Sequence, residues 1–178
     1  MPNPRLRRHA AGASLVEVTV VMALVAVLAR SVLPGWSDAR DRRSLQAASA
    51  QLANDLHLAR SLAAAQGLPV RLGSVAAQGC YVVHTGPARG CACNAAGAVQ
   101  CSGDAQALRV AVLPGSGRLA FSASSASMLF DADRGTVTPT GTLRLQLADG
   151  RAIHHVVNIM GRARTCSPRG AVPGHPPC

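Results

Sequence analysis

Two arginines near the end of the chain, Arg162 and Arg164, are the side chains best suited to bind a ligand that carries phosphates. A guanidinium group offers a planar fork of donors that matches phosphate oxygens. If the chain is extended here, both side chains point to one side at a spacing of ~6–7 Å, near that of successive backbone phosphates. Gly161 lets the backbone turn or approach a ligand closely, and Arg151 and Arg169 could widen the basic patch. The alternative is a solvated pair, or one that packs against a neighbouring subunit.

A single carboxylate, Glu17, lies in an apolar stretch over residues 14–33. A stretch of about 20 residues is long enough to cross a bilayer as a helix. A charge at membrane depth costs on the order of 2.5–3.5 kcal/mol on insertion scales, so such residues are usually functional. A basic head with three arginines precedes the stretch, which predicts that residues 1–12 stay in the cytoplasm and the rest lies outside. A secretory signal peptide and an ordinary single-pass anchor are the alternatives.

Six cysteines follow the apolar stretch, and their even number predicts disulfides in an oxidising compartment. Cysteines two residues apart pair poorly with each other. We therefore expect Cys91 and Cys93 to pair with Cys80 and Cys101, in an order that stays open. The presence of His84 in this segment suggests zinc as an alternative, but the paired Cys-x-x-Cys knuckles of zinc sites are missing. No metal site is predicted.

The last two cysteines, Cys166 and Cys178, bracket a tail rich in proline and glycine. Such a composition does not sustain a helix or a central strand. We predict a Cys166–Cys178 disulfide that closes the tail into a loop and holds Arg164 and Arg169 close together. The alternative is that these two cysteines pair with the other four.

The sequence contains no motif that is typical of a catalytic site. The eight carboxylates are few and scattered, there is no Gly-x-Ser-x-Gly elbow, and the absence of lysine excludes a phosphate-binding loop of the Gly-x-x-x-x-Gly-Lys type. Four aromatic residues are too few for a platform that stacks single-stranded bases. The formal charge of +10 indicates an acidic or phosphate-bearing partner. The alternative is a genome of high GC content, which favours arginine throughout its proteins. We therefore expect neither enzymatic activity nor a cofactor.

The elements that must position these residues begin with one long helix, predicted from Ser14 to about Gln66 and bent near Pro34. Its second half has an apolar face whose residues recur at steps of three and four. The stripe consists of Leu45, Ala48, Leu52, Leu56, Ala59 and Ala63. The sequence Gly67-Leu68-Pro69 ends the helix.

Short apolar runs between glycine, serine and proline clusters predict strands in the rest of the chain. The runs are at 70–72, 81–83, 108–113, 119–121, 128–130 and 143–147. Asp149-Gly150 is typical of a hairpin turn. We expect the return strand to run from Ile153 to Met160 and, being apolar on both sides, to be central and covered on both faces. His154 and His155 fall on opposite faces, with His155 on the side of Ile153. The fold class is α+β, with a long helix packed on antiparallel sheets.

The N-terminal sequence resembles that of type IV pilins and of the pseudopilins of type II secretion. The shared features are Gly12, the apolar stretch that follows, Glu17 four residues after Ala13, and Pro34. The resemblance implies that a prepilin peptidase cleaves after Gly12 and that Ala13 is then N-methylated, although most members have Phe or Met there. It also implies that Glu17 guides assembly by pairing with the N-terminal amine of a neighbouring subunit.

The β-rich second part, which closes with Gly161-Arg162-Ala163-Arg164, is similar to the FimT/GspH family of minor pilins and pseudopilins. In the FimT branch this motif is implicated in binding DNA during natural transformation. The resemblance implies a minor pilin of a type IV pilus that binds the phosphate backbone of extracellular DNA with little sequence preference. The alternatives are a GspH-like minor pseudopilin of a type II secretion system and a structural minor pilin without a ligand.

The expected organisation follows from these assignments. Residues 1–12 are the leader, 13–35 the transmembrane or filament-core helix, 36–66 its amphipathic half, 67–165 a β-rich domain and 166–178 the closed tail. The resemblance implies an inner-membrane protein with a periplasmic C-terminal domain, which later joins other pilins or pseudopilins in a filament.

Overall fold

The computed structural model describes residues 14–113 and 118–178, and the chain divides into two compact units, Met1–Arg40 and Asp41–Cys178. Gly12 and Ala13, the predicted cleavage junction, lie outside the described residues. The side chains of residues 31–34 also lie outside them, and the bend predicted at Pro34 falls there.

Helix α1 begins at Leu15 in the first unit and ends at Gln66 in the second. Its large apolar side chains between Leu15 and Leu28 are exposed, from 50% for Val18 to 80% for Leu15. Within the described residues, this is the one helix that is long and apolar enough to cross a membrane. The long helix predicted from the sequence is confirmed to within a residue at each end.

In the second unit, residues 41–66 of α1 bury one apolar face. Every member of the stripe predicted from the sequence is at most 3% exposed, from Leu45 to Ala63. Spacing at three and four residues places these side chains on one side of the helix, where they join the core of the unit. The side chain of Asp55 also lies on this side, and its Oδ2 accepts a hydrogen bond of 2.8 Å from the Tyr81 hydroxyl. Arg109 lies 3.4 Å from the other carboxylate oxygen of Asp55, so this buried charge is compensated.

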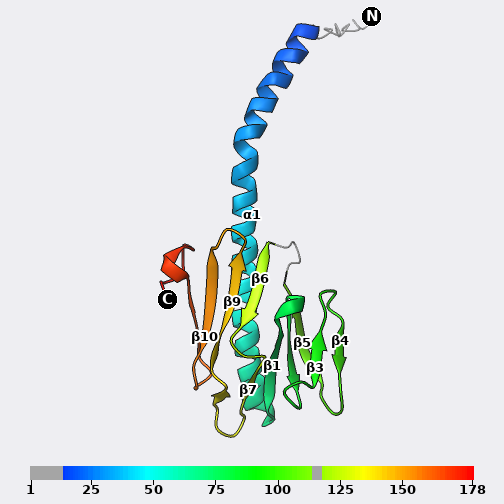
Figure 1. The fold of residues 1–178 in the computed structure, drawn as a ribbon, viewed down its shortest axis with the longest axis vertical. Coiled ribbons are helices and arrows are strands. Elements are labelled where there is room, and N and C mark those ends of the chain that lie inside the picture. The colour runs from blue at the N-terminus through cyan, green and yellow to red at the C-terminus, as the bar shows by residue number, and fades with distance from the viewer. Residues whose placement is uncertain (1–13, 114–117) are drawn as a thin grey trace, which may run out of the picture. The chain divides into compact units, whose positions relative to one another are not determined.

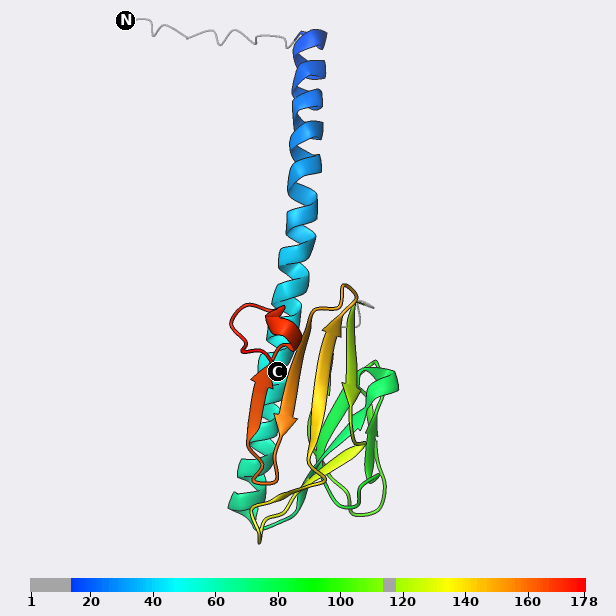
Figure 2. The ribbon, with the colours of Figure 1, turned by 60° about the vertical axis from the view of Figure 1, so that its left-hand side comes forward.

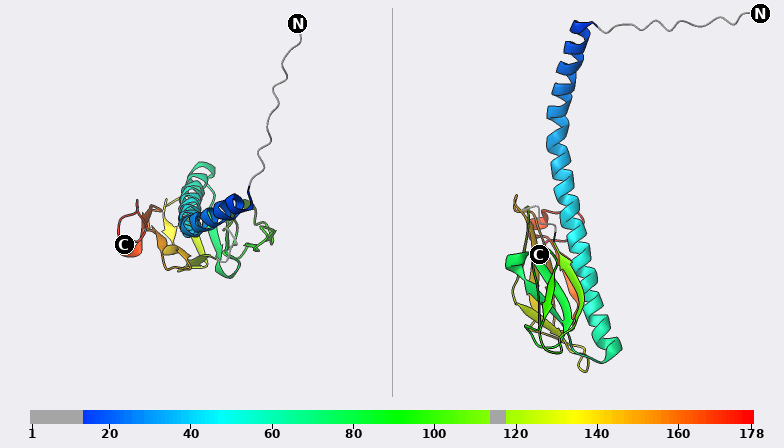
Figure 3. Two further views of the ribbon diagram at one scale, coloured as in Figure 1. Left: turned by 90° about the horizontal axis from the view of Figure 1, so that it is seen from above. Right: turned by 90° about the vertical axis from the view of Figure 1, so that its right-hand side faces the viewer.

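Two antiparallel sheets pack on this part of the helix (Figures 1 and 2). The first sheet has the order β5-β2-β1-β7-β8 and the second has the order β11-β10-β9-β6. The strands of the first sheet are β1 (Val70–Val75), β2 (Cys80–Thr85), β5 (Ala107–Val112), β7 (Ser127–Phe130) and β8 (Val137–Thr138). The strands of the second are β6 (Leu119–Ala123), β9 (Gly141–Leu147), β10 (Ala152–Val157) and β11 (Ala163–Cys166). Both sheets lie along one side of the helix segment (Figure 3, right).

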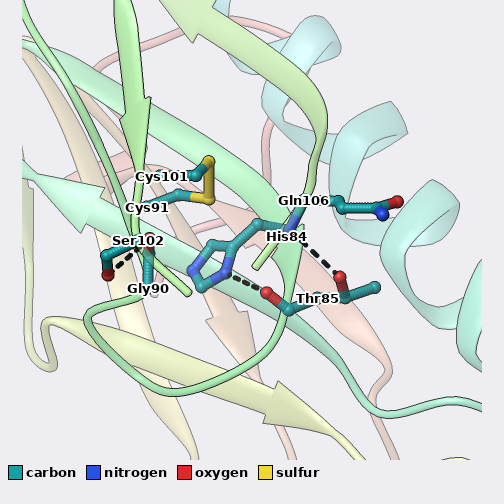
Figure 4. Close-up of a disulfide and its surroundings, with 7 residues drawn as sticks. All are labelled: His84, Thr85, Gly90, Cys91, Cys101, Ser102 and Gln106. Carbon is teal, nitrogen blue, oxygen red and sulfur yellow. Dashed lines mark hydrogen bonds between the residues drawn. A yellow bond between two sulfur atoms is a disulfide. The ribbon is translucent and has the colours of Figure 1, made fainter. Parts of the chain in front are cut away.

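A hairpin of β3 (Cys91–Cys93) and β4 (Val99–Cys101) covers the face of the first sheet that points away from the helix. Disulfides Cys80–Cys93 and Cys91–Cys101 hold it there. His84 is fully buried beneath the hairpin, with its Nδ1 2.9 Å from the Thr85 carbonyl oxygen (Figure 4). The expectation that Cys91 and Cys93 pair with Cys80 and Cys101 is therefore met, and the structure supplies the order.

The return strand predicted over residues 153–160 is shorter than expected. β10 ends at Val157, and Ile159 and Met160 are exposed in the turn that follows. β10 is indeed an inner strand, between β9 and β11, but one of its faces is only partly covered, since His154 and Val156 are half-buried. The prediction failed because apolar residues of a turn were counted as strand. The short strands β3, β4, β8 and β11 were not predicted.

Candidate functional site

The turn between β10 and β11, residues 158–162, positions the arginine pair. Asn158 closes it with three hydrogen bonds: its backbone N–H donates to the Arg162 carbonyl (3.1 Å), its carbonyl accepts from the Gly161 N–H (2.9 Å), and its Oδ1 accepts from the Arg162 N–H (2.9 Å). An asparagine side chain commonly stabilises a turn in this way. A further bond, from the Val137 N–H to the Ile159 carbonyl (2.7 Å), ties the turn to β8. The turn is thus a fixed platform.

Arg162 and Arg164 both have exposed side chains, one just before β11 and the other within it. Ala163 between them packs against the core, so its strand neighbour Arg164 points to the opposite side of β11. Arg164 pairs in register with Val156 of β10. Among the described residues, neither arginine has an ion-pair partner. Arg164 is thus in an extended strand, whereas Arg162 directly precedes it.

Gly161 adopts a conformation that L-residues rarely take. Its φ is +68°, and a Cβ atom at this position would lie 3.1 Å from Val137 Cγ2 and 3.3 Å from Arg60 Cδ. The glycine is required both by its backbone angle and by the close contact with its neighbours. Its role is to shape the turn.

Gly161→Ala is expected to lower the free energy of unfolding by more than the roughly 1–2 kcal/mol that a left-handed L-residue costs, because Val137 and Arg60 must also shift. Gly135→Ala is the matched control, since Gly135 has a φ of +63° and no atom within 4 Å of the added Cβ. Urea unfolding of the full chain in detergent micelles compares the two. Equal losses would mean that the contacts around Gly161 are easily relieved.

Arg151 and Arg169, which were expected to widen the basic patch, do not lie in the turn that holds Arg162. Arg151 precedes β10 and its guanidinium binds Asp149, with contacts of 2.6 and 2.7 Å. This pairing lowers the pKa of the Asp149 carboxyl. Arg169 follows β11 in a short 3-10 turn (η2, Pro168–Gly170), after Ser167, whose hydroxyl donates to the Ala152 carbonyl. Both arginines therefore lie at the opposite end of β10 from the turn over residues 158–162.

Two other arginines contribute charge that the sequence analysis did not identify. The side chain of Arg60 on α1 lies beside Gly161. Arg144 on β9 is exposed and pairs in register with His154, on the same face of the second sheet as Arg164. Asp131 in the neighbouring β7–β8 connection opposes this charge but interacts with Arg134 at 3.8 Å. In the sequence, Arg60 could be recognised only as the neighbour of Ala59 on the apolar face of the helix. That position does not indicate which part of the β-rich domain Arg60 would contact.

The two histidines of β10 lie on opposite faces of the strand, as predicted. His154 is half-buried on the outer face, and partial burial followed by the nearby Arg144 charge lowers its pKa. His155 is fully buried on the core side, where its Nε2 lies 3.0 Å from the Ser49 hydroxyl of α1. Burial lowers the pKa of His155 to about 4, with smaller effects from His175 and His154.

The tail is closed by a disulfide between Cys166 and Cys178, as the sequence predicts. Their Cα atoms are 5.0 Å apart. Within the loop, Val172 is 1% exposed and belongs to the core, and its N–H donates to the Ser167 hydroxyl at 3.1 Å. In the part of the chain that the structure describes, no three histidine, cysteine or acidic side chains gather as a metal site.

Glu17 lies in the first turn of α1 and is exposed. A carboxylate in the first helical turn faces the positive end of the helix dipole. The apolar side chains around it are exposed as well, and this part of the helix is long and apolar enough to cross a membrane.

Comparison with known proteins agrees with this architecture. Residues 48–161 match the model of the family described as type II transport protein GspH. This chain belongs to the GspH family. No curated protein sequence matches the chain. The matched stretch ends at Gly161, so Arg162 and Arg164 of this GspH-family protein lie just beyond it.

Solved structures share the fold of this GspH-family protein. The minor pseudopilin EpsH from the type 2 secretion system of Vibrio cholerae is similar with a TM-score of 0.51 and 12% identity, over 70% of this chain and 98% of EpsH. The type IV minor pilin FimU of Pseudomonas aeruginosa is similar with a TM-score of 0.51 and 20% identity, over 72% of this chain and 95% of FimU. The resemblance to the FimT/GspH family and the pilin-like α+β fold are thereby confirmed.

Proposed function

We propose that this GspH-family protein is a non-enzymatic minor pilin of a type IV pilus that binds extracellular DNA during natural transformation. The observation that carries the proposal is the pair Arg162 and Arg164, which is exposed and without ion-pair partners among the described residues. The backbone of Arg162 is held by Asn158, and Arg164 lies in β11. Arginine forks without competing carboxylates are free to bind phosphates.

The ligand that fits best is double-stranded DNA, recognised through its backbone. Arg162 and Arg164 lie within three positions of each other and have no acidic residue near them in the chain, since residues 150–178 contain no Asp or Glu. Arg60 and Arg144 add two cations on or near the same surface. Contacts to phosphates alone carry no sequence information, so binding should be sensitive to salt and nearly independent of sequence.

Arg162→Ala together with Arg164→Ala is expected to weaken DNA binding at least about tenfold, similarly for all sequences. The slope of log K against log salt should fall by about 0.9 for each phosphate that the variant no longer neutralises. Fluorescence anisotropy with labelled duplexes and the full chain in detergent micelles measures both quantities.

The matched control is Arg151→Ala with Arg169→Ala, which removes the same charge at the far end of β10. It should change affinity much less. If the unmodified protein shows no salt-sensitive binding, or if both double variants weaken it equally, the arginine pair is not a DNA site.

The N-terminal residues support assembly into a filament by the route that the family resemblance implies. We propose cleavage by a prepilin peptidase after Gly12, N-methylation of Ala13, and pairing of Glu17 with the Ala13 amine of a neighbouring subunit. Pairing removes most of the cost of a lone charge in an apolar environment. Before assembly the exposed apolar part of α1 would anchor the protein in the inner membrane, with the second unit in the periplasm. Mass spectrometry of the mature N-terminus tests this route, and an intact Met1 would contradict it.

The second candidate is a minor pseudopilin of a type II secretion system. It is favoured by the description of the matching family and by the similarity to EpsH. In that case the second unit would contact other pseudopilins or an exported protein. The genes next to this one, and the filament from which the protein is isolated, separate the two candidates.

A further inference from the structure

The turn over residues 158–162 presents two large apolar side chains to solvent, Ile159 at 58% and Met160 at 50% exposure. We call these two residues the apolar tip. Among the described residues of the second unit, one other large apolar side chain is exposed to this degree, that of Leu68 at 52%. Two adjacent exposed apolar residues beside a candidate binding site suggest a role in binding, since isolated ones need no explanation.

The apolar tip is held in place. The Ile159 carbonyl accepts the Val137 N–H at 2.7 Å, and the Asn158 side chain closes the turn against the Arg162 N–H at 2.9 Å. The buried Gly161 packs against Val137 and Arg60 and prevents the turn from shifting. The tip is therefore preorganised at a constant position relative to Arg162, and ordering it costs little when a ligand binds.

Three arginines lie close to the apolar tip in the chain or beside its turn. Arg162 follows it after one residue, Arg164 lies on the strand that continues from it, and Arg60 lies beside Gly161. A short apolar projection flanked by arginines is complementary to a ligand with a charged outer surface and an apolar interior that can be opened. Duplex DNA has this chemistry, with phosphates outside and stacked bases within.

We propose that the apolar tip enters the minor groove of the DNA that Arg162 and Arg164 hold, and that Ile159 and Met160 partly unstack one base step there. Apolar wedges of this kind kink the duplex, and the cost of unstacking is offset by additional contacts to the backbone. This inference rests on the proposed function, because the arginine pair must bind the phosphates first. It adds a specific consequence, since kinking is easiest at pyrimidine–purine steps.

The variant Ile159→Ala with Met160→Ala tests the proposal in the full chain in detergent micelles. A duplex of about 20–30 base pairs with a central TA step and a dye at each end reports binding by anisotropy and bending by energy transfer. We expect the variant to bind about tenfold more weakly, to keep the salt slope of the unmodified protein, and to lose the bend. Leu68→Ala is the control, since it truncates an equally exposed apolar residue outside the turn.

The outcomes separate this inference from the proposed function. If the unmodified protein does not bind DNA, the proposed function and the inference both fail. If it binds with the expected salt slope but does not bend the duplex, or if the tip variant binds and bends like the unmodified protein, the inference is overturned and the arginine site stands. Loss of binding to vesicles with anionic lipid in the tip variant, without a change toward DNA, would likewise overturn it and identify a membrane contact.

Discussion

Replacing Cys166 and Cys178 by serine is expected to lower the free energy of unfolding of the second unit by about 3 kcal/mol. The disulfide joins residues 12 positions apart, and in the chain-entropy account a closed loop of this size restricts the unfolded chain by about that amount. The loss is a large fraction of the roughly 5–15 kcal/mol that a typical domain has. Urea unfolding of the full chain in detergent micelles, followed by near-ultraviolet circular dichroism, measures it.

The structure indicates which part of the Cys166→Ser, Cys178→Ser variant should unfold first. The bridge keeps Val172 in the core, and it keeps the Ser167 N–H bonded to Pro176 at 2.8 Å and the Cys178 N–H bonded to Ser167 at 3.3 Å. In the variant these amides should exchange with solvent before the rest of the sheet. Cys91→Ser with Cys101→Ser is the control, because it opens a loop of similar size in the β3–β4 hairpin and should leave the tail protected. A loss below about 1 kcal/mol, or Cys166 found linked to another cysteine by peptide mapping, would contradict the assignment.

Much of the framework could be predicted because periodicity reports which side of an element is buried. The stripe from Leu45 to Ala63 identified the helix and its core face, since steps of three and four residues allow no other repeat. Alternation of Leu143 and Leu145 with Arg144 identified an outward-facing charge on β9 in the same way. Cysteine spacing narrowed the pairing to two possibilities, but only the crossing of β3 over the first sheet decides between them.

The candidate site was predicted only in part, because it depends on contacts between distant elements. Arg162 and Arg164 could be recognised since their two-residue spacing is local. Arg151 could not be excluded from sequence, since its pairing with Asp149 depends on the geometry of the hairpin. Arg60 could not be included, since its neighbour Gly161 is 101 positions later in the chain. The apolar tip was assigned to a strand because hydrophobic composition does not distinguish a buried strand end from an exposed turn.

Acidification from pH 7 to pH 4 is expected to destabilise the second unit by about 3 kcal/mol through His155 alone. Burial lowers the pKa of His155 from 6.5 to about 4 in the folded protein. Between these two pH values a proton binds to His155 in the unfolded chain and not in the folded protein. The stability that the neutral, buried His155 contributes therefore decreases as the pH falls and is absent below pH 4. A difference in pKa of one corresponds to about 1.4 kcal/mol. The Ser49 hydroxyl contacts His155 and is 3.0 Å from its Nε2. The charges of His175 and of His154, which lies on the other face of the strand, also oppose the protonation of His155.

His155→Gln isolates this effect, because glutamine offers Ser49 a hydrogen-bond partner and does not titrate. The variant should be less stable at pH 7, where its shape fits the core less well, but its stability should depend less on pH between 6.5 and 4. His154→Gln is the control on the opposite face of the same strand and should keep most of the dependence. Carboxylates such as Asp149, whose pKa is lowered by Arg151, also lose their stabilising charge in acid. The unmodified protein therefore loses stability in acid for other reasons as well, and the effect of His155 is the difference between the two variants and the unmodified protein. If His155→Gln and the unmodified protein lose stability in parallel, then the pKa of His155 in the folded core is close to its value in the unfolded chain, and this prediction is wrong.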